Sequence, residues 1–232
     1  MKTAVLTTIF NEEKNIEAVL AKISPDYDIF VVDDGSSDNT INILRHLGIH
    51  IISLPINIGQ GAATIAGYNV ILEKDYDIIV KLDGDGQHNP SEISHFVGAM
   101  REGDDDIVVG SRRLGSNYIT APFLRRTFLP AFAWLINVAT GYRMTDPMCG
   151  FRAFRTKSLK KVIASLNNSI EPQYLASEMF VRCSRAGLSV GEIPINLLER
   201  SSGNSYKGEM RYGFGVLRAL TKALLDKGKS PL

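Results

Sequence analysis

Apolar runs alternate with segments of helical spacing along the first half of the chain. Runs rich in aliphatic and β-branched residues predict buried strands at 3–9, 28–32, 49–54, 77–82 and 106–111. Between these runs, apolar residues at helical spacing predict helices at 13–23, 39–47, 61–74 and 91–102. Strand and helix alternating at this interval predict right-handed βαβ units, and therefore an α/β fold with a mainly parallel sheet flanked by helices.

The second half of the chain has a less regular pattern. A further strand is predicted at 190–196, and the Gly- and Ser-rich residues 199–208 predict a loop. Beyond that loop, apolar positions at helical spacing predict an amphipathic helix. We therefore expect one domain over residues 1–208, followed by an amphipathic C-terminal helix and tail over residues 209–232.

Polar residues follow the predicted strands. They are Asn11-Glu12, Asp33-Asp34, Asn57 to Gly61, Asp83 to Gln87, and Arg112-Arg113. Ligands of parallel sheets bind beyond the carboxyl ends of the strands. These five polar loops therefore predict one ligand site at that edge of the sheet.

The segment VKLDGDGQHNP, residues 80–90, places three oxygen-bearing side chains at alternate positions. If the segment is extended, Asp83, Asp85 and Gln87 project to one side. Oxygen ligands suit a hard divalent cation such as Mg²⁺ or Mn²⁺, which also binds substrate phosphates. The alternative is a polar turn that leads into a helix, and residues 89–92 do have the pattern of a helix start.

Two further loops are candidates for nucleotide contacts. Asp33 is placed to accept hydrogen bonds from a ribose or a base, and the alternative is that Asp34 and Ser36 only shape the turn. Gly59 and Gly61 precede a helix and suit either a phosphate cradle or close packing of the loop. The chain lacks the glycine pattern of a Rossmann fold and the P-loop motif, which argues against redox and kinase functions.

Composition narrows the class of protein further. A net charge of +1 argues against a nucleic-acid-binding protein. Cys149 and Cys183 fit no metal or disulfide framework, so we expect a reducing, cytoplasmic location. The first ten residues predict a strand and not a signal peptide. No apolar run reaches the roughly 20 residues that span a bilayer, so we expect no membrane-spanning helix.

Six motifs in order carry a resemblance to a known family. They are FNEEKNI, VVDDGSSDNT, NIGQGAA, DGDGQHNP, GSR and DPMCGFRAF. Over about residues 3–207 the chain resembles the family 2 glycosyltransferases, and within them the polyprenyl-phosphate sugar synthases such as dolichol-phosphate mannose synthases. The resemblance implies a GT-A fold, a nucleotide-diphosphate sugar donor, a divalent cation (Mg²⁺ or Mn²⁺) and inversion at the anomeric carbon.

The resemblance, with the loop carboxylates and glycines above, gives candidate site residues. The expected donor-binding residues are Thr8, Phe10, Glu12, Val31, Asp33, Asp34, Gly59, Gly61, Asp83, Gly84 and Lys207. The expected metal ligands are Asp85 and Gln87. The expected catalytic residues are Asp85, Arg112, Asp146, Arg152, Glu178 and Arg200.

Two positions depart from the family pattern. Thr8 stands where the family often has Pro, which leaves the base open between guanine and uracil. Tyr206 stands where a late family motif has Lys, and Lys207 is the nearest substitute because a lysine reaches phosphate as a flexible point charge.

Three functions fit these residues. The leading one is transfer of a sugar, mannose or glucose, to a polyprenyl phosphate, which arrives ionised and needs no strong base. The second is transfer to a saccharide hydroxyl in polysaccharide synthesis, for which Asp146 or Glu178 must take the proton. The third is a non-catalytic nucleotide-sugar binder.

Two stretches are candidates for contact with a membrane. Residues 121–143 are predicted to be helical over 123–140 and mix Arg125 and Arg126 with Phe, Leu and one Trp, which suits a membrane interface. The C-terminal helix interleaves apolar and basic residues, which suits a membrane surface or a membrane-bound partner. The alternative for both stretches is that they cover the back of the sheet. We expect peripheral contact at the cytosolic face of a membrane.

Overall fold

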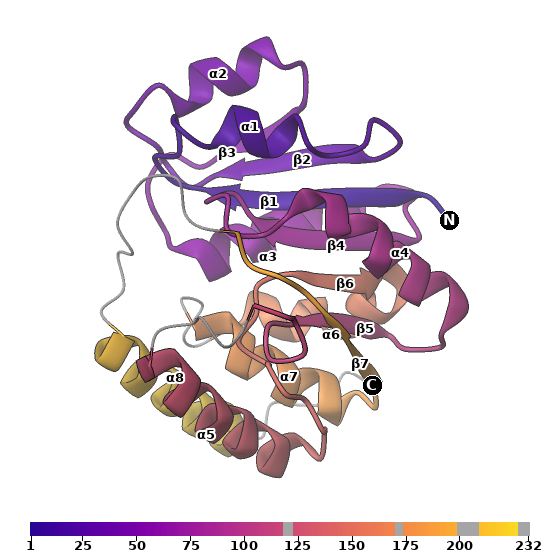
Figure 1. Cartoon of the computed structure of the whole chain (residues 1–232), viewed down its shortest axis with the longest axis vertical. Coiled ribbons are helices and arrows are strands. Elements are labelled where there is room, and N and C mark those ends of the chain that lie inside the picture. The colour runs from indigo at the N-terminus through magenta and orange to yellow at the C-terminus, as the bar shows by residue number, and fades with distance from the viewer. Residues whose placement is uncertain (118–122, 170–173, 199–208, 227–232) are drawn as a thin grey trace.

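The computed structural model describes residues 1–117, 123–169, 174–198 and 209–226. In chain order its elements are β1 (Thr3–Ile9), α1 (Ile16–Leu20), β2 (Asp28–Asp33), α2 (Thr40–His46), β3 (His50–Ser53), α3 (Gln60–Leu72), β4 (Ile78–Asp83), η1 (Pro90–Glu92), α4 (Ile93–Glu102), β5 (Ile107–Ser111), α5 (Phe123–Thr140), β6 (Arg152–Arg155), α6 (Thr156–Asn167), α7 (Leu175–Arg185), β7 (Val190–Pro194) and α8 (Glu209–Leu225). Figure 1 shows the sheet with helices on both sides.

The described strands form one sheet in the order β3-β2-β1-β4-β6-β5-β7. Every pairing is parallel except those of β6, which runs antiparallel to both β4 and β5. The expected mainly parallel α/β sheet is confirmed. The sequence pattern missed β6. Its first three residues end the DPMCGFRAF motif, and the strand gains its hydrogen bonds from two strands distant in sequence.

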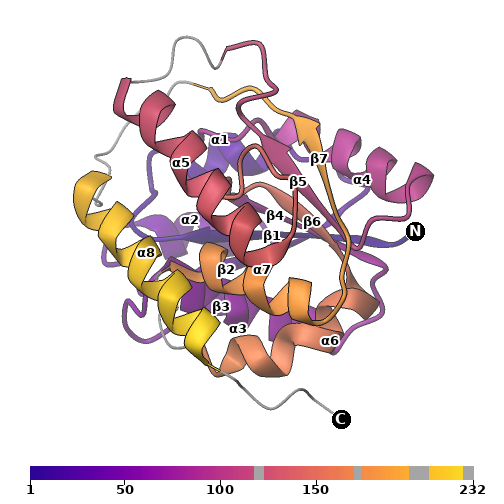
Figure 2. The same cartoon turned by 90° about the horizontal axis from the view of Figure 1, so that it is seen from below.

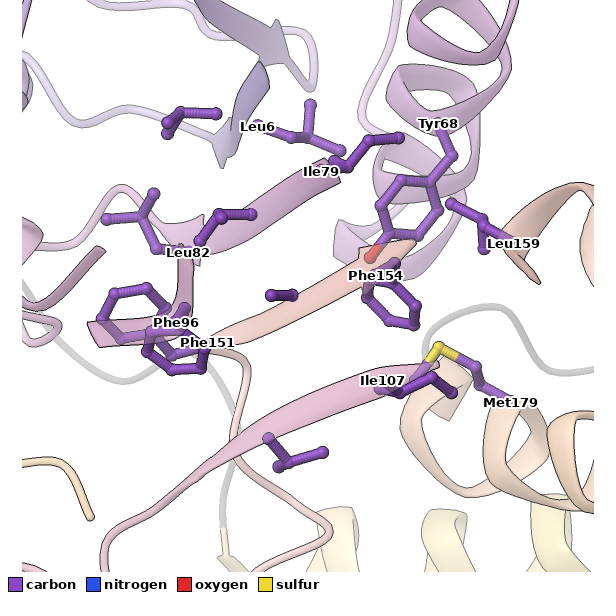
Figure 3. Packing of buried hydrophobic residues seen from close by; sticks show 14 of the residues in the cluster. Leu6, Tyr68, Ile79, Leu82, Phe96, Ile107, Phe151, Phe154, Leu159 and Met179 are labelled. Atoms are coloured by element: carbon purple, nitrogen blue, oxygen red, sulfur yellow. The ribbon is translucent and has the colours of Figure 1, made fainter. Parts of the chain in front are cut away.

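The core lies on both faces of the sheet. On one face, Tyr68 of α3 meets Phe154 of β6 edge to face, with ring centroids 5.4 Å apart. On the other face, Phe96 of α4 stacks on Phe151, just before β6, at 4.2 Å. Figure 3 shows both groups of side chains. Strands buried on both faces carry continuous apolar runs, which is why their positions could be predicted.

Two predicted helices begin differently in the structure. The segment predicted at 13–23 is helical only over Ile16–Leu20, because residues 12–15 form a turn closed by Asn15 N–H donating to Glu12 O at 3.0 Å. The segment predicted at 91–102 starts as the short 3₁₀ helix η1 before α4. Asn89 caps it as expected, its Oδ1 accepting from Ser91 N–H at 3.2 Å.

A helical layer of α5, α7 and α8 lies below the sheet in Figure 1, with both α5 and α8 packed against α7 (Figures 1 and 2). Arg182 and Arg185 of α7 bind the C-terminal end of α8. Arg182 Nη2 lies 2.9 Å from an Asp226 carboxylate oxygen, and Arg185 donates to the Leu224 and Asp226 carbonyls at 3.0 and 2.7 Å. Among the described residues, no helix is long and apolar enough to cross a membrane.

Candidate active site

Loops that follow five strands, β1 to β5, are joined at the carboxyl edge of the sheet by hydrogen bonds and an ion pair. Ser37 N–H, after β2, donates to Asn11 Oδ1, after β1, at 2.8 Å. Gln60, at the start of α3, donates to Asp83 Oδ1, at the end of β4, at 2.5 Å. After β5, Arg112 pairs with Asp146. The expected convergence of the polar loops is therefore present.

The loop after β1 is bent sharply at Asn11, which has a positive φ of 54°. Ser36 Oγ accepts from Asn11 N–H at 2.9 Å, and Thr40 Oγ1 accepts from Glu12 N–H at 3.0 Å. Phe10 and Glu12 are half-buried here, so each keeps part of its surface at the edge. Thr8 lies deeper, in β1 between Val32 and Asp83, and is buried.

The two carboxylates that end β2 have different surroundings. Asp33 accepts from Ser36 N–H at 3.2 and 3.3 Å, one bond to each oxygen. Asp34 accepts from Ile58 and Gly59 N–H at 2.8 and 2.9 Å. Burial raises the pKa of Asp34, and these two backbone donors oppose that shift. Asp34 thus fixes the loop before α3, a role that the sequence pattern did not indicate, and its donor contact stays a prediction. Val31 lies two residues before Asp33 in β2 and is fully buried.

Asp83 is held by groups that the sequence pattern did not single out. Lys81, only 6% exposed, forms an ion pair with Asp83 Oδ1, the oxygen that Gln60 also contacts. His88 Nδ1 accepts from Asp83 N–H at 3.1 Å, which assigns the imidazole proton to Nε2, facing Cys149 Sγ at 3.9 Å. Burial lowers the pKa of His88 and favours the neutral ring. The sequence signal that could have revealed this contact is a single lysine, Lys81, within an apolar strand.

The metal-ligand segment is not extended, contrary to the expectation. The strand ends at Asp83, residues 84–85 form a turn, and Gly86 has φ +78°. Within this turn Asp85 Oδ1 accepts from Gln87 N–H at 3.1 Å, which holds the two predicted ligands close together. Gly84 is buried, and a Cβ there would lie 2.3 Å from Ile9 Cγ2, so its close approach serves packing.

The protein oxygens at this turn suit a cation that takes most of its ligands from water and substrate phosphates. No group of three or more His, Cys, Asp and Glu side chains suited to a metal occurs among the described residues. Mg²⁺ and related ions are commonly held by one or two protein oxygens together with water and substrate phosphates. Asp85 and Gln87 supply such a pair, while the Asp83 charge is already matched by Lys81.

Arg112 and Asp146 form a bidentate pair. Arg112 Nε and Nη2 donate to the two Asp146 oxygens at 2.5 and 2.7 Å, and Arg112 N–H adds a bond at 3.1 Å. Asp146 is 0% exposed. Glu192 of β7, which the sequence pattern did not single out, accepts from the backbone N–H groups of Thr145 and Asp146 at 2.7 and 2.9 Å. Two planar groups locked in this way hold the guanidinium in one orientation.

Arg152 and Glu178 lie deeper than the sequence suggested. Arg152 is 6% exposed, donates to Pro147 O at 2.8 Å and lies over the Phe180 ring at 4.8 Å. It thus supports the 146–150 loop from beneath. Glu178 of α7 accepts from Arg182 at 2.7 Å, within the helical layer.

The 146–150 loop meets Asp83, at the end of β4, at Gly150. A Cβ at this position would lie 2.4 Å from Asp83 Oδ2, so only glycine allows the loop to approach this carboxylate. Gly59 and Gly61 begin α3, one at its N-cap and one buried in its first turn. Arg200 and Lys207 lie outside the described residues. The segment that leads to them is described up to Leu198, whose N–H donates to Gln87 O at 2.8 Å.

The family model for glycosyl transferase family 2 matches residues 4–163. The undecaprenyl-phosphate mannosyltransferase of Micrococcus luteus is 29% identical over 214 residues, covering 88% of this chain and 87% of that protein. A UDP-N-acetylglucosamine–dolichyl-phosphate N-acetylglucosaminyltransferase of Methanococcus voltae is 28% identical over 240 residues, covering 95% and 94%.

Among solved structures, the chain is similar to glucosyl-3-phosphoglycerate synthase from Mycobacterium tuberculosis, solved with Mn²⁺, UDP and phosphoglyceric acid. The TM-score is 0.70 at 21% identity, covering 96% of this chain and 78% of that one. At this identity the likeness concerns the fold, and it confirms the expected GT-A architecture. Since the family model covers well over half of the chain and the fold agrees, the chain belongs to glycosyl transferase family 2.

Proposed function

We propose that the protein transfers a hexose, mannose or glucose, from a nucleotide-diphosphate donor to a polyprenyl phosphate, with inversion at the anomeric carbon. The observation that carries the proposal is that both candidate bases already have partners. Asp146 is fully buried and binds Arg112 through both oxygens. Glu178 is 1% exposed and accepts from Arg182 and Ser169. An acceptor that is ionised on arrival needs neither carboxylate as a base, so a lipid phosphate suits this site better than a sugar hydroxyl.

In this reaction an oxygen of the acceptor phosphate forms a bond to the anomeric carbon. The bond from that carbon to the donor phosphate breaks, and its electron pair leaves with the nucleoside diphosphate. Arg112, oriented by Asp146, places a fixed positive charge beside the leaving group. Arg200 is proposed as a second cation, since the segment that leads to it passes beside Gln87.

A divalent cation, Mg²⁺ or Mn²⁺, bound by Asp85 and Gln87 would neutralise charge on the departing diphosphate. Arg152 is proposed to act by supporting the 146–150 loop. The residues proposed to contact the donor are Thr8, Phe10, Glu12, Val31, Asp33, Asp34, Gly59, Gly61, Asp83, Gly84 and Lys207.

The relatives support the choice of acceptor. The Micrococcus luteus and Methanococcus voltae proteins differ in the sugar that their names give, mannose and N-acetylglucosamine, and both names contain a polyprenyl phosphate. We therefore propose a polyprenyl-phosphate acceptor here and leave the donor to the experiment below, which compares GDP- and UDP-sugars.

We also propose peripheral contact with the cytosolic face of a membrane through α5 and α8, with residues 1–208 as the transferase domain and 209–232 as its helical extension. Trp134 and Val138 of α5 are 64% and 68% exposed, and Leu225 of α8 is 75% exposed. Arg143 and Arg218, both exposed, lie in or next to the same two helices. Apolar side chains beside cations suit the boundary between headgroups and acyl chains.

The test is transfer from GDP-mannose, UDP-glucose and UDP-N-acetylglucosamine with Mn²⁺ or Mg²⁺, with and without undecaprenyl phosphate. We expect metal-dependent sugar-lipid formation from one donor, abolished in Asp85→Ala and retained in the exposed control Asp104→Ala. Transfer to a saccharide hydroxyl instead would overturn the choice of acceptor. Donor binding without any transfer would overturn the enzymatic proposal.

A further inference from the structure

One row of residues across the sheet contains three ionisable side chains. The strand registers place Leu6 beside Lys81, Lys81 beside Arg152, Arg152 beside Val109, and Val109 beside Glu192. Because residues opposite each other on neighbouring strands project to the same face, the three charged side chains share one face. Lys81 and Arg152 are each only 6% exposed and Glu192 is half-buried, and burying charges is costly unless they find partners.

The neighbouring row on the same face, farther from the site, is entirely apolar. It consists of Ala4, Ile79, Phe154, Ile107 and Val190. Figure 3 shows Ile79, Phe154 and Ile107 of this row packed against α3, α6 and α7. The row with the charged side chains therefore lies between the apolar core and the candidate site.

Each charged member of the row holds one part of the site. Lys81 pairs with Asp83, the last residue of β4. Arg152 donates to Pro147 O. Glu192 accepts from two successive backbone N–H groups, those of residues 145 and 146. The row therefore supports two sides of the site separately, the Asp83 side through Lys81 and the Arg112 side through Glu192.

We propose that Lys81 and Glu192 are positioning residues for the transfer. Lys81 fixes the Asp83 carboxylate for donor binding, and Glu192 fixes the Asp146 turn that orients the Arg112 fork toward the leaving group. This inference rests on the proposed function. It predicts a division of effects: loss of Lys81 weakens donor binding, whereas loss of Glu192 slows the chemical step.

The Lys81 half is tested by calorimetric titration of UDP and of GDP, each with Mn²⁺, into the full chain. In Lys81→Met we expect the Kd of the preferred nucleotide to rise tenfold or more, as for loss of a charge-assisted contact. Lys81→Arg keeps the charge and should bind within about threefold of wild type. Lys160→Met, an exposed site on α6, is the matched control.

A second variant keeps the test valid if Lys81→Met fails to fold. Gln60 is exposed and contacts the same Asp83 oxygen, so Gln60→Leu tests the same anchor without risk to the core. We expect its Kd to rise by about threefold or more. Wild-type affinity in both Lys81→Met and Gln60→Leu would overturn the Lys81 assignment, as would an equal loss in Lys81→Arg and Lys81→Met.

The Glu192 half is tested by steady-state kinetics of Glu192→Gln beside the exposed control Glu73→Gln. We expect kcat to fall about tenfold or more, since one of the backbone donors loses its acceptor, while the Kd of the nucleotide stays within about twofold. A matching loss of nucleotide affinity, or an unchanged kcat, would overturn the assignment.

These outcomes are separable from failure of the proposed function. If wild-type protein makes no sugar-lipid, the proposed function fails, yet nucleotide binding by the Lys81 and Gln60 variants still tests the donor half. If wild-type protein is active and the variants show no division between Kd and kcat, the proposed function stands and the positioning role of the row fails.

Discussion

Two regions of the molecule each contain an arginine paired with a buried carboxylate, and the two pairs connect different parts of the fold. Arg112 and Asp146 connect two loops at the carboxyl edge of the sheet, between β5 and β6. Arg182 and Glu178 are four residues apart on α7, and Arg182 also reaches Asp226 beyond α8. The first pair fixes a charge at the site, whereas the second fixes one helix on another. We therefore propose that the first pair serves the transfer reaction, whereas the second serves stability.

The strongest way to test this contrast is to remove the site arginine. In Arg112→Ala we expect kcat to fall by about 10²–10³, because a fixed charge near the leaving group is lost. Steady-state transfer kinetics measure the change, and Arg101→Ala, an exposed arginine of α4, is the control. A fall of less than tenfold would place Arg112 outside the transfer step.

Removing the helix arginine should affect stability instead. Arg182→Met leaves the Glu178 carboxylate buried and unmatched, which costs about 3–5 kcal/mol of unfolding free energy. Denaturant unfolding measures it, and kcat of the folded fraction should stay within about twofold of wild type. Arg185→Met, which loses only exposed hydrogen bonds to the end of α8, should cost about 1 kcal/mol. If Arg182→Met lowered kcat as Arg112→Ala does, the contrast would be wrong.

Gly150 offers a gentler change at the site itself. The added Cβ of Gly150→Ala would press against Asp83 Oδ2, so we expect about 1–3 kcal/mol of destabilisation and a weaker affinity for the donor. Thermal unfolding and nucleotide titration report the two effects. Gly98→Ala is the matched control, because a Cβ there meets nothing within 4 Å. Equal behaviour of the two variants would show that the loop simply moves aside.

The smallest expected effect lies on the outer helices. Trp134→Ser should weaken binding to liposomes that contain anionic lipid by about tenfold, because a large apolar side chain leaves the interface. Nucleotide affinity should be unchanged. Liposome co-sedimentation measures the loss, with Val70→Ser, an exposed apolar position on α3, as the control. Undiminished co-sedimentation of Trp134→Ser would remove α5 from the membrane contact.

The first half of the chain could be predicted from the sequence because its strands and loops have local sequence signals. Buried parallel strands carry apolar runs, and polar residues mark where they end, as Asp33 and Asp83 do. The second half could not be predicted in this way. β6 owes its conformation to partners on both sides, and the Arg112–Asp146 pair joins residues 34 apart in the sequence. In the sequence alone, Lys81 and Glu192 have no recognisable partners, because the folded sheet brings their partners to them.

The insertion of β6 between β4 and β5 also has a consequence for biosynthesis. When the ribosome has made β1 to β5, the strand that belongs beside β4 is still missing, and β5 has no place in the sheet. About 70 residues separate the end of β4 from the end of β6, which corresponds to roughly 4–14 s of synthesis. During that interval the β4 edge presents unpaired backbone groups, the usual template for aggregation. We therefore expect the nascent chain to be most prone to aggregation until these four residues have been made.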